Sequence, residues 1–431
     1  MKIDLIFTIV LLAISIQLCL SQLGGRRDQA AAKATANKNA RTSIEDFSLQ
    51  FYKSLANLPE VQSQNIFVSP LSVWALLVLT AEGAQSNTLR QIENNIGTVQ
   101  NFQREFREIQ QDLLISKSDI KVIGEQLAFS DKSLPVKREY EQLIDTYYNV
   151  KLQKLDFSRK NAKQTYERIN QIVEKVTGGK VLKPLNPLDI IDAKLVLLSL
   201  MYFKADWTSP FNSSLTQTQA FYDEKDVEIT KVPMMYQKGV FPYMASKQIN
   251  GHVLELPYGQ DKSMSMILVL PRKGTPLSEV VENLSQMKME EVYNQLTQSI
   301  IDYEDDEVEV LIPKFEFNGD YQLRVILEKM GISDVFHEQS ADLSRLTDDN
   351  SIFLNSILQK TKIIVNEQGT EASAATTATF IDKITPPKFF ANRPFFYMIV
   401  NKEKKLILFM GQVGNPSLTE VNKNKGQSRD Q

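Results

Sequence analysis

Side chains that could act as a catalytic base are few in this sequence. His252 and His337 are the only histidines among 431 residues, and neither stands beside a recognisable partner. A hydrolase needs a nucleophile next to a base, and no G-x-S-x-G, H-E-x-x-H, phosphate-loop or G-x-G-x-x-G motif occurs. Sequence clusters of metal-ligating residues are also missing. We therefore expect neither an enzyme nor a protein that depends on a cofactor or metal.

The most unusual stretch is 367–387, EQGTEASAATTATFIDKITPP. Its middle part, 372–381, has no charge, proline or glycine, and consists of Ala, Ser and Thr except for its last two residues. Such a segment is soluble when exposed and can also join a sheet, since threonine favours strands. A surface linker has a similar composition. The length of the loop, the strand-like run 362–367 before it and its lone basic residue, Lys383, indicate a functional loop instead.

Apolar spacing predicts a mixed helix-and-sheet chain around this segment. Apolar residues recur every three or four positions over 44–58, which predicts a helix that Pro59 stops. A second, buried helix should follow Ser69-Pro70, because serine caps helices and proline suits their first turn. Buried strands and a hairpin are also predicted, at Leu195–Phe203, Met264–Leu270, and Phe395–Val400 with Leu406–Met410. Strands and helices do not alternate regularly, so the expected class is α+β in one domain.

The N-terminus carries the pattern of a secretory signal peptide. Lys2 precedes an apolar stretch, Leu5–Leu20, and the small residues near Ser21 suit a cleavage site. A membrane anchor is the alternative, but the stretch is shorter than the ~20 residues that a spanning helix needs. We therefore predict a signal peptide over 1–21 and a secreted, extracellular protein.

Composition divides the rest of the chain into three parts. Residues 22–43 form a polar extension, 44–418 a single globular domain and 419–431 a polar tail. We expect the extension to be disordered rather than a frayed helix. The one cysteine, Cys19, lies in the signal peptide, so the mature chain has no disulfide and depends on core packing. The net charge of −3 favours neither nucleic acid nor a membrane as a partner.

The stretch E-x-G-T-E-A-x-A-A-T, Glu367–Thr376, resembles the hinge of the reactive-centre loop in the serpin family. Further motifs match the family in order, over nearly the whole of the mature domain. They are Asn65–Ser72 (NIFVSPLS), Leu200–Trp207 (LMYFKADW), Val253–Tyr258 (VLELPY), Ser265–Pro271 (SMILVLP), Ile312–Phe315 (IPKF), Ala341–Ser344 (ADLS), Arg393–Phe396 (RPFF) and Leu406–Pro416 (LILFMGQVGNP). Each motif is short, but together and in this order they are very specific.

The resemblance implies a serpin fold of three β-sheets and about nine helices, with an exposed reactive-centre loop at 367–387. In the family, a serine protease cleaves this loop and forms an acyl-enzyme, and the loop then inserts into the main sheet as a new strand. The implied function is a secreted inhibitor of serine proteases that forms a covalent 1:1 complex. The alternative is a carrier or chaperone on the same fold without inhibitory activity.

Counting along the family's loop places the cleaved bond at Lys383–Ile384, with Pro386-Pro387 in register. A trypsin-like protease has a carboxylate at the base of its specificity pocket, and this group pairs with an extended cation. The alternative is that Lys383 is an ordinary solvated lysine. The resemblance favours trypsin-like targets, in an extracellular cascade such as clotting or innate immunity.

The hinge residues suit insertion into a sheet. Alternate side chains of an inserted strand point into the core, and the residues on that face are all small: Thr370, Ala372, Ala374 and Thr376. Gly369 gives the backbone freedom to bend. We therefore expect an inhibitory hinge formed by Glu367, Gly369, Thr370, Glu371, Ala372, Ala374, Ala375 and Thr376.

Four residues match family positions at which the main sheet opens. Serpins usually have asparagine at the position of Ser199 and histidine at that of Gln359. These groups hydrogen-bond with the serines that match Ser69 and Ser72. Serine and glutamine still donate and accept hydrogen bonds, so one change can compensate for the other.

Two further positions match the family at the loop end of the main sheet. Trp207 matches the tryptophan under the top of that sheet, and Lys314 is expected to form an ion pair with Glu367. An exposed pair of this kind contributes under about 1 kcal/mol.

Secretion would also allow glycosylation. Asn212 and Asn283 each begin an N-x-S sequence and are candidate glycosylation sites. Many serpins bind heparin through a basic helix, but the matching region, 101–114, alternates basic and acidic residues. We expect a solvated helix face there rather than a site for a heparin-type polyanion, and a monomeric protein.

Overall fold

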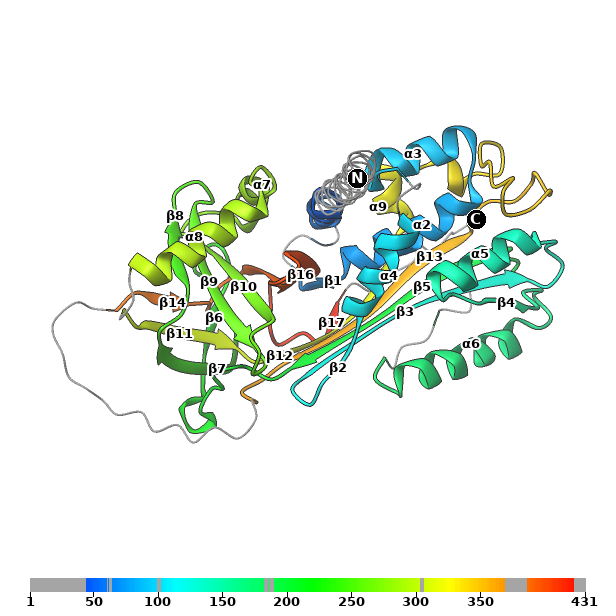
Figure 1. The fold of residues 1–431 in the computed structure, drawn as a ribbon. Coiled ribbons are helices and arrows are strands. Elements are labelled where there is room, and N and C mark those ends of the chain that lie inside the picture. The colour runs from blue at the N-terminus through cyan, green and yellow to red at the C-terminus, as the bar shows by residue number, and fades with distance from the viewer. Residues whose placement is uncertain are drawn as a thin grey trace, which may run out of the picture. The chain divides into compact units, whose positions relative to one another are not determined.

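The computed structural model (Figure 1) describes residues 44–421 except for 60, 62–63, 99–101, 182–184, 186–189, 303–305 and 369–385. These described residues belong to one compact unit. The described residues contain nine α-helices and three β-sheets, as the resemblance implies. The helices are 44–56, α2 (Pro70–Gly83), α3 (Ser86–Ile96), α4 (Phe102–Leu113), α5 (Arg138–Tyr148), α6 (Ala162–Thr177), α7 (Leu277–Ser285), α8 (Met289–Asp302) and α9 (Arg324–Lys329).

The start of α2 follows the predicted capping pattern. Ser69 Oγ accepts a hydrogen bond from the backbone nitrogen of Ser72 at 3.3 Å, and Pro70 occupies the first turn. Almost every side chain of α2 is buried, so the prediction of a helix in the core is confirmed. Short 3₁₀ turns, η3 (Ser213–Leu215) and η4 (Asp334–Phe336), complete the helical elements of the described chain.

The largest sheet has seven strands. In spatial order they are β17 (Glu420–Val421), β12 (Phe315–Gln322), β13 (Ser356–Val365), β5 (Leu195–Ala205), β3 (Ile120–Asp131) and β2 (Leu114–Ser116), with β4 (Leu152–Leu155) paired to β3. β13 is antiparallel to β12, and β5 is antiparallel to β3. β13 and β5 are parallel to one another. The pairing of these two central strands therefore differs from that of their outer neighbours.

Two smaller sheets complete the fold. The six-stranded sheet has the order β1 (Ile66–Val68), β16 (Leu406–Val413), β15 (Phe395–Asn401), β10 (Met264–Pro271), β9 (Gly251–Tyr258) and β8 (Tyr243–Ser246). The four-stranded sheet has the order β14 (Lys388–Phe390), β11 (Val308–Pro313), β7 (Glu228–Gly239) and β6 (Gln217–Tyr222). The hairpin predicted around 401–405 is confirmed as β15 and β16.

The large sheet separates two apolar clusters. The main cluster includes Leu197 and Met201 of β5 and most of α2, whereas the smaller one includes Leu198 of β5 and Ile169 of α6. In Figure 1, α2 and α6 accordingly lie on opposite sides of the sheet. Because side chains alternate along a strand, Ser199 shares its face with Leu197 and Met201 and points toward α2.

Candidate functional site

Two polar side chains meet where β5 and β13 pair. Ser199 on β5 and Gln359 on β13 are partners in the strand register. Ser199 Oγ donates a hydrogen bond of 2.8 Å to Ser72 Oγ on α2, and Gln359 Nε2 donates one of 2.7 Å to the same oxygen. The hydroxyl of Ser72 therefore connects the two central strands of the large sheet.

Gln359 also holds the start of α2. Its Nε2 donates to the Ser69 carbonyl at 2.9 Å, and its Oε1 accepts from the Ser69 backbone nitrogen at 3.0 Å. Ser72 Oγ in turn donates to the Ser69 carbonyl at 3.1 Å. Ser69, Ser72, Ser199 and Gln359, here called the seam network, are fully buried. Buried polar groups destabilise a fold unless they are paired, and these hydrogen bonds supply the pairing.

Neighbouring residues extend the attachment toward β12. Thr361 Oγ1 on β13 donates to the Phe67 carbonyl at 2.6 Å, and the Phe67 nitrogen donates to the hydroxyl of Tyr321 on β12 at 3.0 Å. Several side chains thus hold β1 and the start of α2 to β12 and β13. The same network reaches β5 through Ser199.

Trp207 lies at the end of the large sheet where the chain leaves β13. Its Nε1 donates to the Asn366 carbonyl at 2.8 Å, and its backbone nitrogen donates to the Gln368 carbonyl at 3.4 Å. The indole stacks on Tyr258 with ring centroids 4.3 Å apart. The buried ring thereby fixes the backbone immediately after β13.

Lys314 and Glu367 form the expected ion pair, with Lys314 Nζ 2.8 Å from Glu367 Oε2. Glu367 Oε1 also accepts a hydrogen bond of 2.9 Å from Thr216 Oγ1. Burial acts to raise the pKa of Glu367, but the hydrogen bonds from Lys314 and Thr216 outweigh it and hold that pKa below its ordinary value. Glu367 is therefore charged at neutral pH and anchors the backbone two residues beyond β13.

The two histidines have structural partners away from this region. His252 Nδ1 lies 2.8 Å from the Tyr243 hydroxyl, and His337 Nε2 lies 3.3 Å from Glu328 Oε1. Among the described residues, no group of three or more His, Cys, Asp or Glu side chains is placed to hold a metal ion. In the same part of the chain, no helix has the length and apolar character required to cross a membrane.

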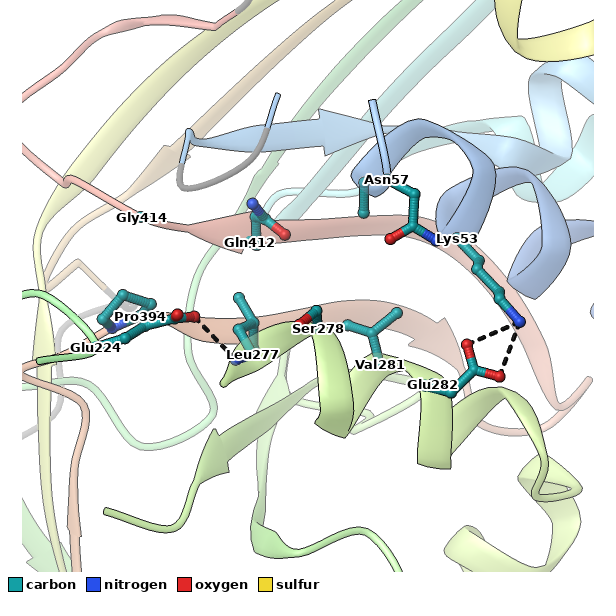
Figure 2. A pocket seen from close by; sticks show the side chains of 11 residues that line it. Lys53, Asn57, Glu224, Leu277, Ser278, Val281, Glu282, Pro394, Gln412 and Gly414 are labelled. Carbon is teal, nitrogen blue, oxygen red and sulfur yellow. Dashed lines mark hydrogen bonds and ion pairs between the residues drawn. The ribbon is translucent and has the colours of Figure 1, made fainter. Parts of the chain in front are cut away.

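A separate pocket lies between the first helix, 44–56, and α7 (Figure 2). Its volume is about 180 Å³. Lys53 from the first helix reaches Glu282 of α7, with Nζ 2.8 Å from Oε2, and Glu224 accepts from the Leu277 backbone nitrogen at 2.9 Å. The charged side chains that line this pocket are thus partnered within the chain.

A family model described as serpin (serine protease inhibitor) matches residues 42–416. The chain belongs to the serpin family. This serpin is 30% identical over 391 residues to intracellular coagulation inhibitor 2 of Tachypleus tridentatus, and the match covers 88% of this chain and 91% of that relative. Proteins of the serpin family are inhibitors of serine proteases in most cases, so the chain is assigned to a family of inhibitors rather than enzymes.

Solved serpin structures match the fold as well. Mouse protein-Z dependent protease inhibitor superposes with a TM-score of 0.75 at 26% identity, covering 88% of this chain and 98% of that one. Thyroxine-binding globulin in complex with thyroxine gives a TM-score of 0.72 at 28% identity, covering 88% and 99%. Chains similar to this serpin thus include proteins named as inhibitors and one named for binding a small molecule.

The seam network is complete in this serpin although two of its residues depart from the usual family pattern. Gln359 spans both the backbone of Ser69 and the hydroxyl of Ser72, and Ser199 completes the set from β5. The shorter Ser199 still reaches the Ser72 hydroxyl, and Gln359 reaches the start of α2. The four residues that sequence comparison grouped do lie together.

The remaining site predictions fall in different places. The predicted reactive bond, Lys383–Ile384, and the hinge positions 369–376 lie outside the described residues. Asn212 is exposed at the start of η3, where its Oδ1 accepts from the Ser214 backbone nitrogen at 2.9 Å. Asn283 is half-buried on α7, and its Nδ2 donates to the Ile249 carbonyl at 3.4 Å.

Sequence comparison did not single out four residues that take part in these contacts. Thr361 carried a weak signal, because it lies two positions after Gln359 and so shares its face of β13. No sequence signal pointed to the other three, because their contacts depend on which distant strands become neighbours: Tyr321, Thr216 and Asn366.

Proposed function

We propose that this serpin is a secreted inhibitor that traps trypsin-like serine proteases covalently, and that the protease cleaves it at Lys383–Ile384. The observation that carries the proposal is the parallel pairing of β13 with β5, from Ser356↔Val196 to Ile363↔Phe203. A strand that turns back after β13 and lies between these two runs antiparallel to both. Antiparallel pairs are slightly more stable per residue than parallel ones. Insertion therefore replaces one parallel ladder with two antiparallel ladders.

The chain that follows β13 has the composition that such an insertion needs. The side chains that would face the core at Thr370, Ala372, Ala374 and Thr376 are small and uncharged. Bulky or charged groups in a packed core destabilise it by roughly 1–3 kcal/mol or more. The sequence directly after β13 avoids that cost.

The side-chain bonds across the central strands are also suited to opening. The bond between Ser199 and Ser72 joins two neutral hydroxyls, and such a bond contributes on the order of 1 kcal/mol net. The bonds of Gln359 to Ser69 and Ser72 stay on the β13 side if the strands separate. Opening between β5 and β13 therefore requires the loss of few side-chain hydrogen bonds within the network.

Lys383 determines which class of protease cleaves the loop. Its extended cation fits a protease pocket with a carboxylate at the base. The protease serine attacks the Lys383 carbonyl carbon, the peptide bond to Ile384 breaks, and an ester links Lys383 to the protease. Insertion of the cleaved segment then carries the ester-linked protease along the sheet before water hydrolyses the ester. The signal-peptide pattern over 1–21 supports an extracellular setting.

A carrier function is less well supported. One similar structure contains thyroxine, and carriers of small molecules need a pocket of roughly 300–1,000 Å³. The pocket between the first helix and α7 has only about 180 Å³, and the Lys53–Glu282 ion pair spans it. This pocket is too small for a ligand of that class, whereas a second groove, of about 530 Å³ and lined in part by Pro387, falls within that size range. The small, uncharged residues after β13, rather than pocket size, therefore favour an inhibitor over a carrier.

The test is to incubate the mature protein with trypsin and to analyse the products on a denaturing gel. A covalent complex, with a released peptide that begins at Ile384, supports the proposal. Cleavage before Ile384 without a complex would show that the protein is a substrate rather than an inhibitor. The departures from the family pattern at Ser199 and Gln359 would then be the first residues to test as the cause. The absence of cleavage between Glu367 and Pro387 would exclude Lys383 as the target residue.

A further inference from the structure

A groove of about 530 Å³ lies where β8, α8 and β11 approach one another. The three elements occupy the same end of the molecule in Figure 1. Apolar side chains form its walls, among them Phe241, Met244 and Ile300. Pro387, the residue directly before β14, completes the wall, and we call this hollow the Pro387 groove.

Exposed apolar side chains gather beside this groove. Val240 and Ile300, which line it, are 50% and 41% exposed, and Ile301, the next residue of α8, is 67% exposed. They are three of the nine large apolar side chains that are exposed in the described part of the chain. A concentration of this kind at a hollow is typical of a contact surface for another protein.

The charges at the groove are of one sign. Asp302 and Asp306 line it, and none of the described lining residues is Lys or Arg. On the adjacent strands, Lys238 is paired with Glu307, and Lys388 Nζ lies 3.8 Å from Glu309 Oε2. These lysines are therefore partly neutralised, and the groove favours a partner that combines an apolar side chain with positive charge.

The position of Pro387 connects the groove to the reactive bond. Pro387 comes three residues after Ile384, and an extended chain spans about 3.3–3.6 Å per residue. The cleaved bond thus lies within roughly 10–15 Å of the groove wall along the chain. A protease is much wider than this distance. A protease that holds Lys383–Ile384 in its active site must therefore approach the groove surface.

We infer that the Pro387 groove is a second contact surface for the target protease. It takes a bulky apolar or aromatic side chain, flanked by Lys or Arg, from a surface loop on the side of the protease that holds Ile384. The inference rests on the proposed function. The groove acts before cleavage, in the first encounter, so it changes the rate of association and the choice of protease rather than insertion of the loop.

The experiment compares second-order inhibition rates for Ile300→Lys and for Val325→Lys, a matched control on α9. Ile300 and Val325 are 41% and 50% exposed, so lysine fits at either position without disturbing the core. The rates are measured with whichever of trypsin, thrombin and plasmin the wild-type protein inhibits fastest. We expect I300K to lower the rate at least fivefold and V325K to leave it within twofold. The number of inhibitor molecules consumed per protease should stay unchanged in both.

A second variant separates charge from shape. Asp306→Asn keeps the shape of the groove but removes one negative charge, so its inhibition rate should fall and should depend less steeply on salt than the wild-type rate. Equal rates for I300K, D306N and wild type, with covalent complexes still formed, would overturn the groove inference and leave the proposed function standing. The groove would then belong to another occupant, such as a small apolar ligand. If the wild-type protein forms no complex with any of the three proteases, the proposed function fails and this inference fails with it.

Discussion

Ser199 and Gln359 stand opposite one another in the register between β5 and β13, and both donate a hydrogen bond to Ser72 Oγ. The two strands run parallel, and their separation is the step that loop insertion requires. The hydroxyl of Ser72 is thus shared by the two sides of the sheet that separate in the proposed mechanism. The strength of its bonds bears on both the stability of the closed sheet and the rate at which the sheet opens.

The first prediction concerns this shared hydroxyl. Ser199→Ala removes one donor but leaves Ser72 bonded to Gln359 and Ser69, so the free energy of unfolding should fall by about 1 kcal/mol. Ser72→Ala leaves both Ser199 and the Gln359 amide short of a partner and should cost roughly 2–3 kcal/mol. Urea unfolding measures both. An equal loss in the two variants would show that Ser72 is not the shared centre of the network.

The second prediction concerns pH. No group in the seam network titrates between pH 5 and 8. Burial raises the pKa of the nearby Tyr321, and the hydrogen bond from Phe67, which acts to lower it, does not offset this, so Tyr321 is neutral. Gln359→His introduces a group with an ordinary pKa near 6.5. Burial among neutral partners lowers the pKa of such a histidine, because the charged imidazolium is disfavoured in the buried site. When acidification protonates the histidine, the closed, folded state is therefore destabilised.

Q359H should therefore lose stability between pH 7 and pH 5 relative to wild type. The melting temperature at several pH values measures this loss. A constant difference between the two proteins across that range would contradict the prediction.

The third prediction concerns the ion pair of Lys314 and Glu367. The pKa of Glu367 is lower in the folded state than its ordinary value of 4.5, so the pair stabilises the fold fully above that value. The stabilisation is lost as the pH falls through the lowered value. Glu367→Gln should reduce the free energy of unfolding at pH 7 by less than about 1 kcal/mol, because Lys314 is 40% exposed.

The difference between E367Q and wild type should then shrink below pH 4. Lys314→Gln is the control, because it removes the same pair from the other side and should behave similarly at pH 7. Urea midpoints at pH 7 and pH 3.5 supply the comparison. A difference that persists unchanged at pH 3.5 would assign the effect to packing rather than charge.

The fourth prediction concerns the hinge. Thr370→Arg places a charge on the face of the inserted strand that meets the core, so insertion should slow and the protein should be cleaved as a substrate. Glu371→Arg is the matched control, because position 371 lies on the other face and already carries a charge. Gel analysis with trypsin, with sequencing of the released peptide to select cleavage at Lys383–Ile384 over cleavage at the new arginine, should show mainly cleaved product for T370R and covalent complex for E371R. Covalent complex in equal yield for both would argue against insertion in this register.

The fifth prediction concerns glycosylation. Asn212 is exposed, whereas Asn283 is half-buried on α7 with its amide nitrogen bonded to Ile249. Secretion from animal cells should therefore add a glycan at Asn212 and none at Asn283. Mass spectrometry of the secreted protein should show a glycan that Asn212→Gln abolishes and Asn283→Gln leaves in place. Loss of mass in N283Q would reverse the assignment.

Much of the local structure could be predicted from neighbouring residues alone. The cap at Ser69 and the hairpin of β15 and β16 depend on contacts between residues at most 18 positions apart, so apolar spacing and turn residues predict them. The grouping of Ser69, Ser72, Ser199 and Gln359 came from the family resemblance. Ser72 and Gln359 are 287 positions apart, and no local pattern connects residues at that separation.

The sequence by itself determined the family, the small-residue segment after β13 and the lone lysine within it, because these are properties of composition and order. Tertiary structure alone decided that β13 and β5 are parallel neighbours, that Ser72 bridges them, and that Thr216 and Trp207 hold the chain beyond β13. It also brought Pro387 together with β8 and α8 around one groove. Hydrogen bonds and apolar contacts act over a few ångströms, so they depend on which distant segments pack together, and folding of the whole chain settles that.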